Sequence, residues 1–430
     1  MKRPSRPPLI VTLFLVLSLA LPSVLPAADV LRAGPYLLFA TRQEGSATVI
    51  DATAMTVRWQ TNGPLPDGAC TIEWGATEAY GRSRPVTCPD NRCVHTIQGL
   101  TPGQMAFYRV KCLEAQYTGS FRAPPAPGAT SLTFFAYGDS RGDEVNAIAS
   151  GQRHVLARLK QEIERDPGKP YTLCVHSGDF VHHGQKPQEW DTDASGLHNE
   201  FFVRKQPNMW FLANIPIAGT LGNHEGYAEF RVTDYANFGQ VFRGYWPYGF
   251  YPADPQAFYY SFDYGPAHFA VIDVNDRVGG NAETGLNTTV AGLSPGTRQF
   301  DWLAADLDSS KPWKIVIMHN PVYTASPPRE RFKANPQLAR NLHDLFKQKG
   351  VRVVIQGHNH YYARRVMDGI TYLTLGGGGA PMYNPIAVGP HEKAVKILHF
   401  ARFDISGKTL TLQVIDDSGN TVETRAIHLQ

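Results

Sequence analysis

Between residues 29 and 125 the chain is dominated by short segments in which apolar and polar residues alternate. These segments are rich in Val, Thr, Ile, Tyr and Trp, and Gly or Pro turns separate them: MTVRWQT, CTIEWG, VHTIQGL and FYRVKC. An alternation with period two places the apolar side chains on one face of a strand. Several short strands at this spacing predict an all-β sandwich.

From residue 131 the pattern changes to unbroken apolar runs of strand length: LTFFAYGD, YTLCVHSGD, IPIAGTLGNH, WKIVIMHN and VRVVIQGHNH. Between them, residues 147–165, 297–307 and 335–350 show helical spacing of their apolar side chains, and the last of these stretches ends at Gly350. Strands that alternate with helices predict a layered α/β fold whose sheet is buried on both sides. The tail, residues 398–429, reads as β-hairpins that complete this domain.

The first residues carry the three parts of an export signal. A basic lead, MKRPSRPP, precedes the apolar run LIVTLFLVLSLAL, and the small residues Ala27 and Ala28 follow. The alternative is a membrane anchor, but the run is short for spanning a bilayer. We therefore predict a cleaved signal (1–28), a β-sandwich domain (29–125) and an α/β domain (126–430), with the Pro-rich FRAPPAPGAT as linker. The mature protein is expected to be secreted or periplasmic and free of the membrane.

The balance of charge limits the kinds of partner. The formal net charge is +3 over 430 residues, and no block of Lys and Arg follows the first residues. Bulk electrostatic attraction to nucleic acid or to a membrane surface is therefore not expected. The sequence leaves the oligomeric state open.

Four of the five cysteines lie between residues 70 and 112. In an exported protein this clustering predicts two disulfides, for which three pairings exist. We favour Cys88–Cys93, which closes the CPDNRC loop, and Cys70–Cys112, which joins two strand-like segments. Zinc binding is the alternative, although CxxC spacing is absent. Cys174 reads as a buried free thiol.

Each of the five apolar runs in the second domain ends in a residue that can bind a metal. These residues are Asp139, Asp179, Asn223 with His224, His319, and His358 with His360. Strand ends in a layered α/β fold converge on one crevice, so we predict that these side chains meet. Carboxylate and imidazole ligands suit Zn, Fe and Mn, and two such ions at about 3.5–4 Å clamp a phosphoryl group.

The motifs around these residues resemble those of a known superfamily. GDS (138–140), GDFVH (178–182), GNHE (222–225), MHNP around His319 and GHNH (357–360) are similar, in order and spacing, to the motifs of the calcineurin-like metallophosphoesterases, and most of all to purple acid phosphatases. The N-terminal region looks like the immunoglobulin-like or fibronectin III-like domain that precedes many such enzymes. The resemblance covers essentially the whole mature chain. It implies mixed β-sheets flanked by helices and attack of a metal-bound hydroxide on a phosphate ester.

The resemblance also implies a role for each matching residue. Asp179 matches the carboxylate that bridges both metal ions. The first ion would take Asp139 and His360, and the second ion Asn223, His319 and His358. His224 matches the histidine that stabilises or protonates the leaving alkoxide. Arg141 has no counterpart in this match, but it lies beside the predicted metal site, and we expect it to meet the phosphate of the substrate.

One position departs from the purple acid phosphatase pattern. The residue three places after the bridging Asp is there a tyrosine that binds Fe(III) and gives the colour, whereas here it is His182. Other members of the superfamily supply a histidine at the position of Arg141, which cannot ligate. We predict that His182 binds the first ion, with His183 or an additional water as alternatives. The protein should then not be purple, and Zn, Mn or Fe(II) become plausible ions.

Three functions compete. The first is an exported acid phosphatase-like enzyme that hydrolyses phosphate monoesters. The second is a phosphodiesterase or nucleotide hydrolase on the same metal pair, which the motifs do not distinguish. The third is a binding protein with an inert phosphoesterase domain. The third is the weakest, because only the tyrosine position departs from the core ligand set.

Overall fold

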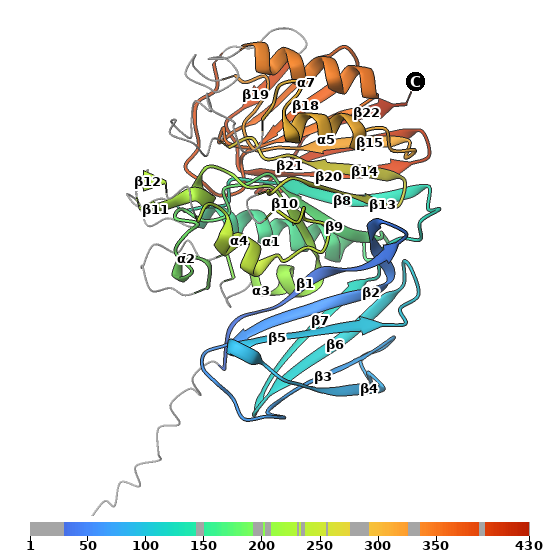
Figure 1. The fold of residues 1–430 in the computed structure, drawn as a ribbon, viewed down its shortest axis with the longest axis vertical. Helices are drawn as coiled ribbons and strands as arrows, with labels where there is room; N and C mark the ends of the chain where they lie inside the picture. Colours follow the sequence, from blue (N-terminus) through green and yellow to red (C-terminus); the bar gives the residue numbers. More distant parts are fainter. Residues whose placement is uncertain are drawn as a thin grey trace, which may run out of the picture.

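The computed structural model describes most of the chain (Figure 1). The described residues are 30–142, 150–191, 201–202, 208–229, 232–233, 237–254, 257–275, 292–325, 336–386 and 392–429. The predicted export signal, residues 1–28, lies outside them. Among the described residues, no helix combines the length and the apolar character that crossing a membrane requires.

The N-terminal part is a sandwich of two antiparallel sheets, as the alternating pattern predicts. The three-stranded sheet has the order β1–β2–β5, with β1 Leu31–Glu44, β2 Ala47–Thr61 and β5 Arg92–Gln98. The four-stranded sheet has the order β4–β3–β6–β7, with β3 Cys70–Gly75, β4 Arg82–Val86, β6 Met105–Cys112 and β7 Ala115–Arg122. A short 3-10 turn, Pro89–Asn91, precedes β5. Buried and less buried residues alternate along β6, and the buried set, which includes Trp59, Ile72 and Tyr108, fills the space between the sheets.

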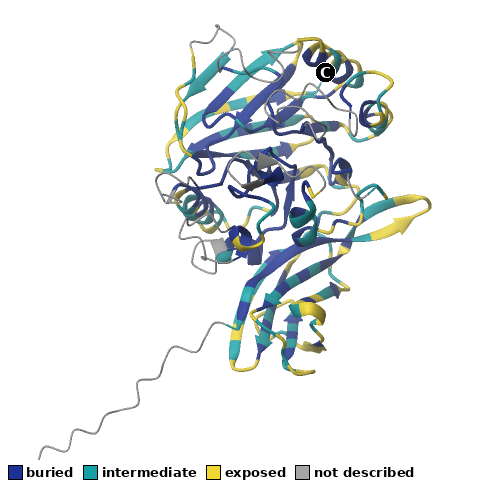
Figure 2. Cartoon of the chain, turned by 60° about the vertical axis from the view of Figure 1, so that its left-hand side comes forward, coloured by how far each residue is buried: buried dark blue, intermediate teal, exposed yellow. Residues whose placement is uncertain are grey.

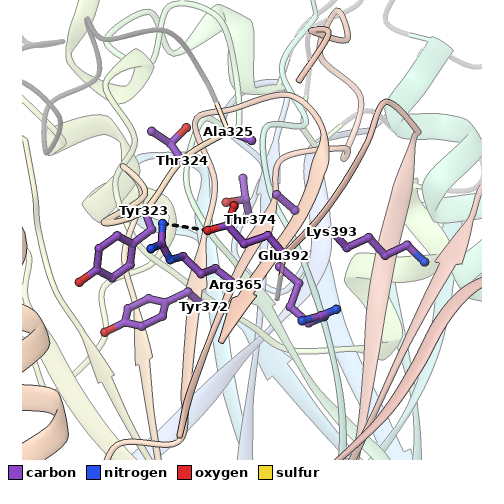
Figure 3. Close-up of a pocket in the computed structure, with 10 residues that line it drawn as sticks. Tyr323, Thr324, Ala325, Arg365, Tyr372, Thr374, Glu392 and Lys393 are labelled. Carbon is purple, nitrogen blue, oxygen red and sulfur yellow. Dashed lines mark ion pairs between the residues drawn. The ribbon is translucent and has the colours of Figure 1, made fainter. Parts of the chain in front are cut away.

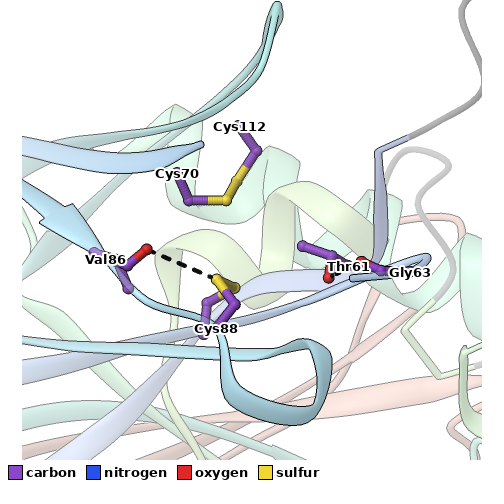
Figure 4. Close-up of a disulfide and its surroundings, with 7 residues drawn as sticks. Thr61, Gly63, Cys70, Val86, Cys88 and Cys112 are labelled. Atoms are coloured by element: carbon purple, nitrogen blue, oxygen red, sulfur yellow. Dashed lines mark hydrogen bonds between the residues drawn. A yellow bond between two sulfur atoms is a disulfide. The ribbon is translucent and has the colours of Figure 1, made fainter. Parts of the chain in front are cut away.

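The two predicted disulfides are confirmed (Figure 4). Cys70 on β3 lies directly opposite Cys112 on β6, and their sulfur atoms are bonded at 2.04 Å. Cys88 is bonded to Cys93 and closes the loop between them. The zinc alternative for these cysteines is therefore wrong. Cys174 is a buried free thiol, as predicted.

Two mixed sheets form the second part of the fold (Figure 1). The six-stranded sheet has the order β10–β9–β8–β20–β21–β22, with β8 Ser131–Tyr137, β9 Tyr171–His176, β10 Ile217–Gly219, β20 His399–Ser406, β21 Thr409–Asp416 and β22 Thr421–His428. The seven-stranded sheet has the order β13–β14–β15–β16–β18–β17–β19, with β13 Tyr260–Tyr264, β14 Ala267–Val271, β15 Trp313–Ile317, β16 Val353–Gln356, β17 Tyr362–Met367, β18 Ile370–Leu375 and β19 Glu392–Val395. A small hairpin pairs β11 Tyr227–Glu229 with β12 Val232–Thr233.

One apolar core joins the two mixed sheets. Phe134 on β8 stacks on Phe403 at 4.6 Å between ring centroids and meets Phe269 of the other sheet edge-on at 5.3 Å. Within the sheets, β8, β9 and β10 run parallel, and so do β14, β15, β16 and β18. The carboxyl ends of the parallel strands in each sheet therefore lie at one edge.

Helices cover the outer faces of the sheets. They are α1 Ser150–Arg165, α2 Gln188–Asp191, α3 Asn208–Asn214, α4 Gln240–Tyr245, α5 Arg298–Asp306 and α7 Pro336–Lys349, with a 3-10 turn at His224–Gly226. The three helices predicted from apolar spacing correspond to α1, α5 and α7, and α7 ends before Gly350, which has a φ of 72°. Apolar side chains of α5 and α7, such as Leu303 and Leu342, form a second core beneath the seven-stranded sheet.

The N-terminal sandwich shares its buried surface with the α/β part. Strand β1 is buried along nearly all of its first ten residues (Figure 2). Tyr36 packs on Phe202 at 4.8 Å and donates a hydrogen bond to the Tyr245 carbonyl at 3.0 Å. Arg32 forms an ion pair of 2.9 Å with Asp191, whose side chain is almost fully buried. The predicted division at residues 125 and 126 therefore separates two parts that pack closely together.

A buried histidine links stability to pH in this fold. His268, 5% exposed, lies between Asp263 and Asp306 with both contacts at 2.8 Å. Burial opposes its charge, but the two carboxylates outweigh burial and raise its pKa from 6.5 to about 9. Its stabilising effect is therefore complete below pH 6.5 and is lost as the pH rises through about 9.

We expect His268→Gln to lower the free energy of unfolding at pH 6 by about 2–3 kcal/mol, since one pKa unit corresponds to about 1.4 kcal/mol and Asp263 is partly screened by solvent. The difference from the native protein should shrink towards pH 10. Urea unfolding at both pH values measures it. A difference that stayed constant with pH would contradict the charged state of His268.

Candidate metal centre

The predicted ligands follow the carboxyl ends of parallel strands from both mixed sheets. Asp139 comes after β8, Asp179 after β9, Asn223 after β10, His319 after β15, and His358 and His360 after β16. The structure brings these six side chains together. Consecutive members of this set lie up to 96 residues apart in the sequence. The order of the strands in the sheets is what places them side by side.

Five of these residues form two overlapping groups. In the first, ligand atoms of Asp139, Asp179 and His360 all lie within 4.8 Å of one another; in the second, those of Asp179, His319 and His358 do. Asp179 belongs to both groups. One carboxylate shared by two sets of donors is the geometry that a bridging ligand requires.

The second group consists of hydrogen-bond acceptors that face one another. His319 donates from Nδ1 to the Ser177 carbonyl at 2.7 Å, which leaves a lone pair on Nε2 of the neutral ring. That Nε2 lies 3.3 Å from Asp179 Oδ1, 3.1 Å from Asn223 Oδ1 and 3.2 Å from His358 Nδ1. Lone pairs that converge in this way repel each other unless a proton or a metal ion lies between them, and carboxylate, amide and imidazole atoms are ligands that suit a metal ion.

The first group contains a carboxylate oxygen that lacks a hydrogen-bond partner. Asp139 is fully buried, and its Oδ2 accepts the backbone N–H of His358 at 2.9 Å. Its Oδ1 has no hydrogen bond and lies 3.5 Å from His360 Nε2. His360 in turn is oriented by a 2.7 Å bond from Nδ1 to the Pro381 carbonyl, the kind of outer contact that fixes a metal-binding imidazole. A cation between Asp139 and His360 would satisfy this oxygen.

The electrostatics of the pocket favour positive charge at its centre. Burial by itself would raise the pKa of Asp179, but His319, His224 and Arg141 hold it well below its usual value. Burial opposes charge on His319, yet Asp179 raises the pKa of that histidine to about 9, so a proton on Nε2 and a metal ion compete for the same position beside Asp179. Burial and the neighbouring His319 lower the pKa of His358 to about 4. The buried carboxylate of Asp179 thus attracts a cation to the point where the ligand atoms of the second group converge.

The loops that carry the ligands need an unusual backbone. Asp139, Asp179 and His358 have φ angles of 58°, 57° and 67°, in the left-handed region that side chains other than glycine seldom adopt. Gly178 has a φ of 95°, and a Cβ at that position would lie 2.6 Å from Nδ1 of His319. The glycine of this motif therefore allows the loops to approach closely enough for their side chains to share a pocket.

Glu225 holds two of these loops together, and sequence reasoning gave it no role. It is fully buried and its carboxylate accepts three backbone N–H groups, from Asp179 at 3.0 Å, Phe180 at 2.8 Å and Gly222 at 2.6 Å. The signal was present, because Glu225 is the last residue of the GNHE motif. An acidic residue inside a buried motif needs several donors, and loop backbones supply them.

His224 lies outside both groups but touches Asp179. Its backbone N–H donates to Asp179 Oδ1 at 3.0 Å, and its Nδ1 donates to the His182 carbonyl at 2.7 Å. Its Nε2 is 3.8 Å from Asp179 Oδ2, and the residue is 7% exposed. The ring is thus fixed at the edge of the pocket with Nε2 directed towards the shared carboxylate.

Arg141 and His182 lie together on the same side of Asp179. Arg141 Nε is 3.7 Å from Asp179 Oδ2, and Arg141 Nη1 is 3.2 Å from His182 Nδ1. A guanidinium can only donate, so that bond requires a lone pair on Nδ1 and places the ring proton on Nε2. His182 belongs to neither group of converging donors, and its role as third ligand of the first ion stays a prediction. Burial and Arg141 lower its pKa to about 4, so the ring is neutral.

A hollow that contains none of the predicted ligands is lined by residues of β17, β18 and β19 and by Tyr323, Thr324 and Ala325 (Figure 3). Arg365 lies over the Tyr323 ring at 4.7 Å and forms an ion pair of 2.8 Å with Glu392. Lys393 donates to the Val422 carbonyl at 2.6 Å. The positive charge of Arg365 is already matched, so this hollow is a poor candidate for binding phosphate.

Comparisons with known proteins identify related chains. The calcineurin-like phosphoesterase family matches residues 132–362. Acid phosphatase type 7 of Homo sapiens is 26% identical over 287 residues, which is 63% of this chain and 56% of that protein. A nucleotide pyrophosphatase/phosphodiesterase of Hordeum vulgare is 24% identical over 304 residues, covering 61% of this chain and 72% of that one.

A purple acid phosphatase from seeds of yellow lupin (Lupinus luteus) shares the fold with a TM-score of 0.64 at 19% identity, over 92% of this chain and 74% of that chain. The chain spans little more than half the length of the human relative. The matched family segment contains all six of the predicted ligands that follow the parallel strands, from Asp139 to His360.

Proposed function

Because the chain belongs to the calcineurin-like phosphoesterase family, we propose that it hydrolyses phosphate monoesters at a centre of two metal ions. The observation that carries this proposal is the pair of overlapping donor groups that share Asp179. Carboxylate, amide and imidazole donors of this kind suit Fe, Zn or Mn. The acid phosphatases among the relatives support a phosphate ester as the substrate.

Each side chain has a proposed role that its position supports. Asp139 and His360 would hold the first ion, Asn223, His319 and His358 would hold the second, and Asp179 would serve both. When bound, the two ions polarise the phosphoryl group and lower the pKa of water.

The chain's other residues act around the phosphoryl group. Arg141, whose guanidinium reaches the edge of Asp179, is placed to bind a phosphoryl oxygen as a charge-assisted donor. His224 donates a proton from Nε2 to the leaving oxygen, or stabilises its charge, in the form of the ring that carries a proton on both nitrogens, because Nε2 faces the pocket while Nδ1–H donates to a carbonyl. Burial of both residues keeps bulk water from weakening these interactions.

An assay with two aryl esters tests the reaction. Purified protein reconstituted with Zn, Mn or Fe is given p-nitrophenyl phosphate and bis-p-nitrophenyl phosphate, with and without a chelator. We expect faster turnover of the monoester and its loss in chelator. Preference for the diester would favour the second candidate, a phosphodiesterase or nucleotide hydrolase, whose activity is named for the barley relative. Absence of turnover with every metal would favour a binding protein.

We propose that the protein is exported and that its N-terminal sandwich (29–125) and phosphoesterase domain (126–430) are its two domains. The two disulfides support an oxidising compartment, secreted or periplasmic, because such bonds are rare in reducing cytosol. Mass spectrometry of the secreted or periplasmic fraction tests this, since cleavage after Ala28 would leave Asp29 as the first residue.

The colour of the protein is expected to distinguish it from purple acid phosphatases. With His182 at the position of their iron-binding tyrosine, natively purified protein should contain about two transition-metal ions per chain, as two donor groups allow, and no visible charge-transfer band. Elemental analysis and an absorption spectrum of the same sample measure both. An intense tyrosinate-to-iron band would contradict His182 as the replacement ligand.

A further inference from the structure

A short loop after β18 is fixed beside the metal centre. At one end the backbone N–H of Ala380 donates to the Asp139 carbonyl, and at the other that of Ile386 donates to the Ala325 carbonyl, both at 2.8 Å. Between them Met382 packs into a small apolar cluster that contains Ala325. The loop therefore has a defined position over residues 381–386, and the side chains it leaves exposed are held in place.

Those exposed side chains are large and apolar. Tyr383 is 44% exposed and Ile386 is 47% exposed. Within the described ranges, Tyr383 is the one aromatic residue among the exposed large apolar side chains, whereas rings such as Tyr361 and Tyr362 nearby are fully buried. Two exposed apolar side chains on a fixed loop beside a site offer surface on which an apolar part of a ligand can pack.

Tyr383 lies directly against a candidate ligand. Its ring stacks on the His360 ring with 4.1 Å between centroids and 20° between planes, and its backbone N–H donates to the His360 carbonyl at 2.9 Å. His360 Nε2 lies 3.5 Å from Asp139 Oδ1, so only the imidazole ring of His360 separates the tyrosine from Asp139 in the first donor group. A leaving group that extends from the first donor group past His360 would therefore meet this ring.

Orientation of His360 does not explain the tyrosine. The imidazole is already fixed by the 2.7 Å bond from Nδ1 to the Pro381 carbonyl, and Asp139 faces its other nitrogen. A ring used only for packing would also be buried. The exposed part of the Tyr383 ring therefore faces the solvent, where a substrate can contact it.

We propose that Tyr383, flanked by Ile386, is a binding wall for the leaving group and makes the enzyme select phosphate monoesters whose alcohol carries an aromatic ring. This inference rests on the proposed phosphatase function and specifies its substrate class. The reaction is unchanged: a water oxygen bonds to phosphorus, the ester P–O bond breaks, and the leaving oxygen takes up a proton to give the alcohol and inorganic phosphate. The aromatic ring of the alcohol stacks on or packs against the tyrosine.

Benzyl phosphate and ethyl phosphate test the wall. Both release a primary alkoxide, so they share their chemistry and differ in the ring. The readout is kcat/KM from released inorganic phosphate on the metal-loaded full-length protein. The native enzyme should prefer benzyl phosphate. Tyr383→Ala should lower the benzyl-to-ethyl ratio by about tenfold, the upper range for one aromatic contact, and mainly through KM. Tyr383→Phe, which keeps the ring, should hold the ratio within about twofold.

The control is Leu113→Ala, an exposed apolar residue on the distant sandwich, which should leave the ratio unchanged. Turnover of ethyl phosphate reports on the metal centre separately. A ratio that stayed constant in Tyr383→Ala, or a native enzyme without preference, would overturn the wall and leave the phosphatase intact. Equal losses on both substrates together with lost metal would show that Tyr383 only supports His360, and would also overturn it. If the loaded native protein turned over neither ester, the proposed function would fail, and the wall with it.

Discussion

Asp179→Asn is expected to lower kcat/KM for a phosphate monoester by about a thousandfold or more and to reduce the bound metal from about two ions per chain to one or fewer. The reason is that Asp179 belongs to both donor groups, so its charge serves both ions. An amide at this position keeps the size but loses the negative charge, and its NH2 group would face donors such as Arg141. Removing one partner from a buried charged set costs about 3–5 kcal/mol, which corresponds to that loss of rate.

Elemental analysis and steady-state kinetics on one preparation measure both effects. Asp308→Asn is the matched control, because Asp308 lies on the surface and pairs with Lys349 in an exposed contact. The control should keep native metal content and rate. The bridging role of Asp179 would be contradicted if Asp179→Asn retained two ions and a rate within about tenfold of native.

His224→Ala is expected to lower kcat by about a hundredfold or more while the protein keeps its metal, the size of effect that one proton donor or charge-stabilising group supplies. His224 is close enough to act, because its Nε2 lies 3.8 Å from Asp179 Oδ2, but it belongs to neither donor group. Its loss should therefore affect the chemical step more than metal affinity, and KM should change little.

His154→Ala provides the control for this variant, since His154 is exposed on α1 and belongs to none of the motifs. Full activity in His224→Ala would refute its catalytic role. Loss of metal would instead make His224 a ligand. The two variants thus separate a residue that holds the ions from one that acts on the substrate: Asp179→Asn changes metal content and rate, whereas His224→Ala changes only the rate.

Much of the fold could be read from the order of residues. Period-two alternation predicted the sandwich, and unbroken apolar runs predicted strands buried on both faces. The helices α1, α5 and α7 were expected from the spacing of their apolar residues, with Gly350 as the stop of the last one. These features depend on neighbours along the chain, and local backbone geometry converts them directly into strands and helices.

The convergence of the candidate ligands was also predictable. Asp139, Asp179, His319 and His358 follow apolar runs, and parallel strands bring their carboxyl ends to one edge of a sheet. The pairing of Cys70 with Cys112 was favoured for a related reason, since both lie on strand-like segments that a sandwich can place side by side.

What the sequence by itself determined, then, is the type of each element and the chemistry at the ends of the strands. Tertiary structure alone decided that β1 packs into the core of the α/β part, that Glu225 ties two ligand loops together, that His182 turns towards Arg141, and that Tyr383 lies on His360. The reason is physical: local periodicity records which face of an element is buried, whereas the partner of a side chain depends on strand order and close packing between segments far apart in the chain.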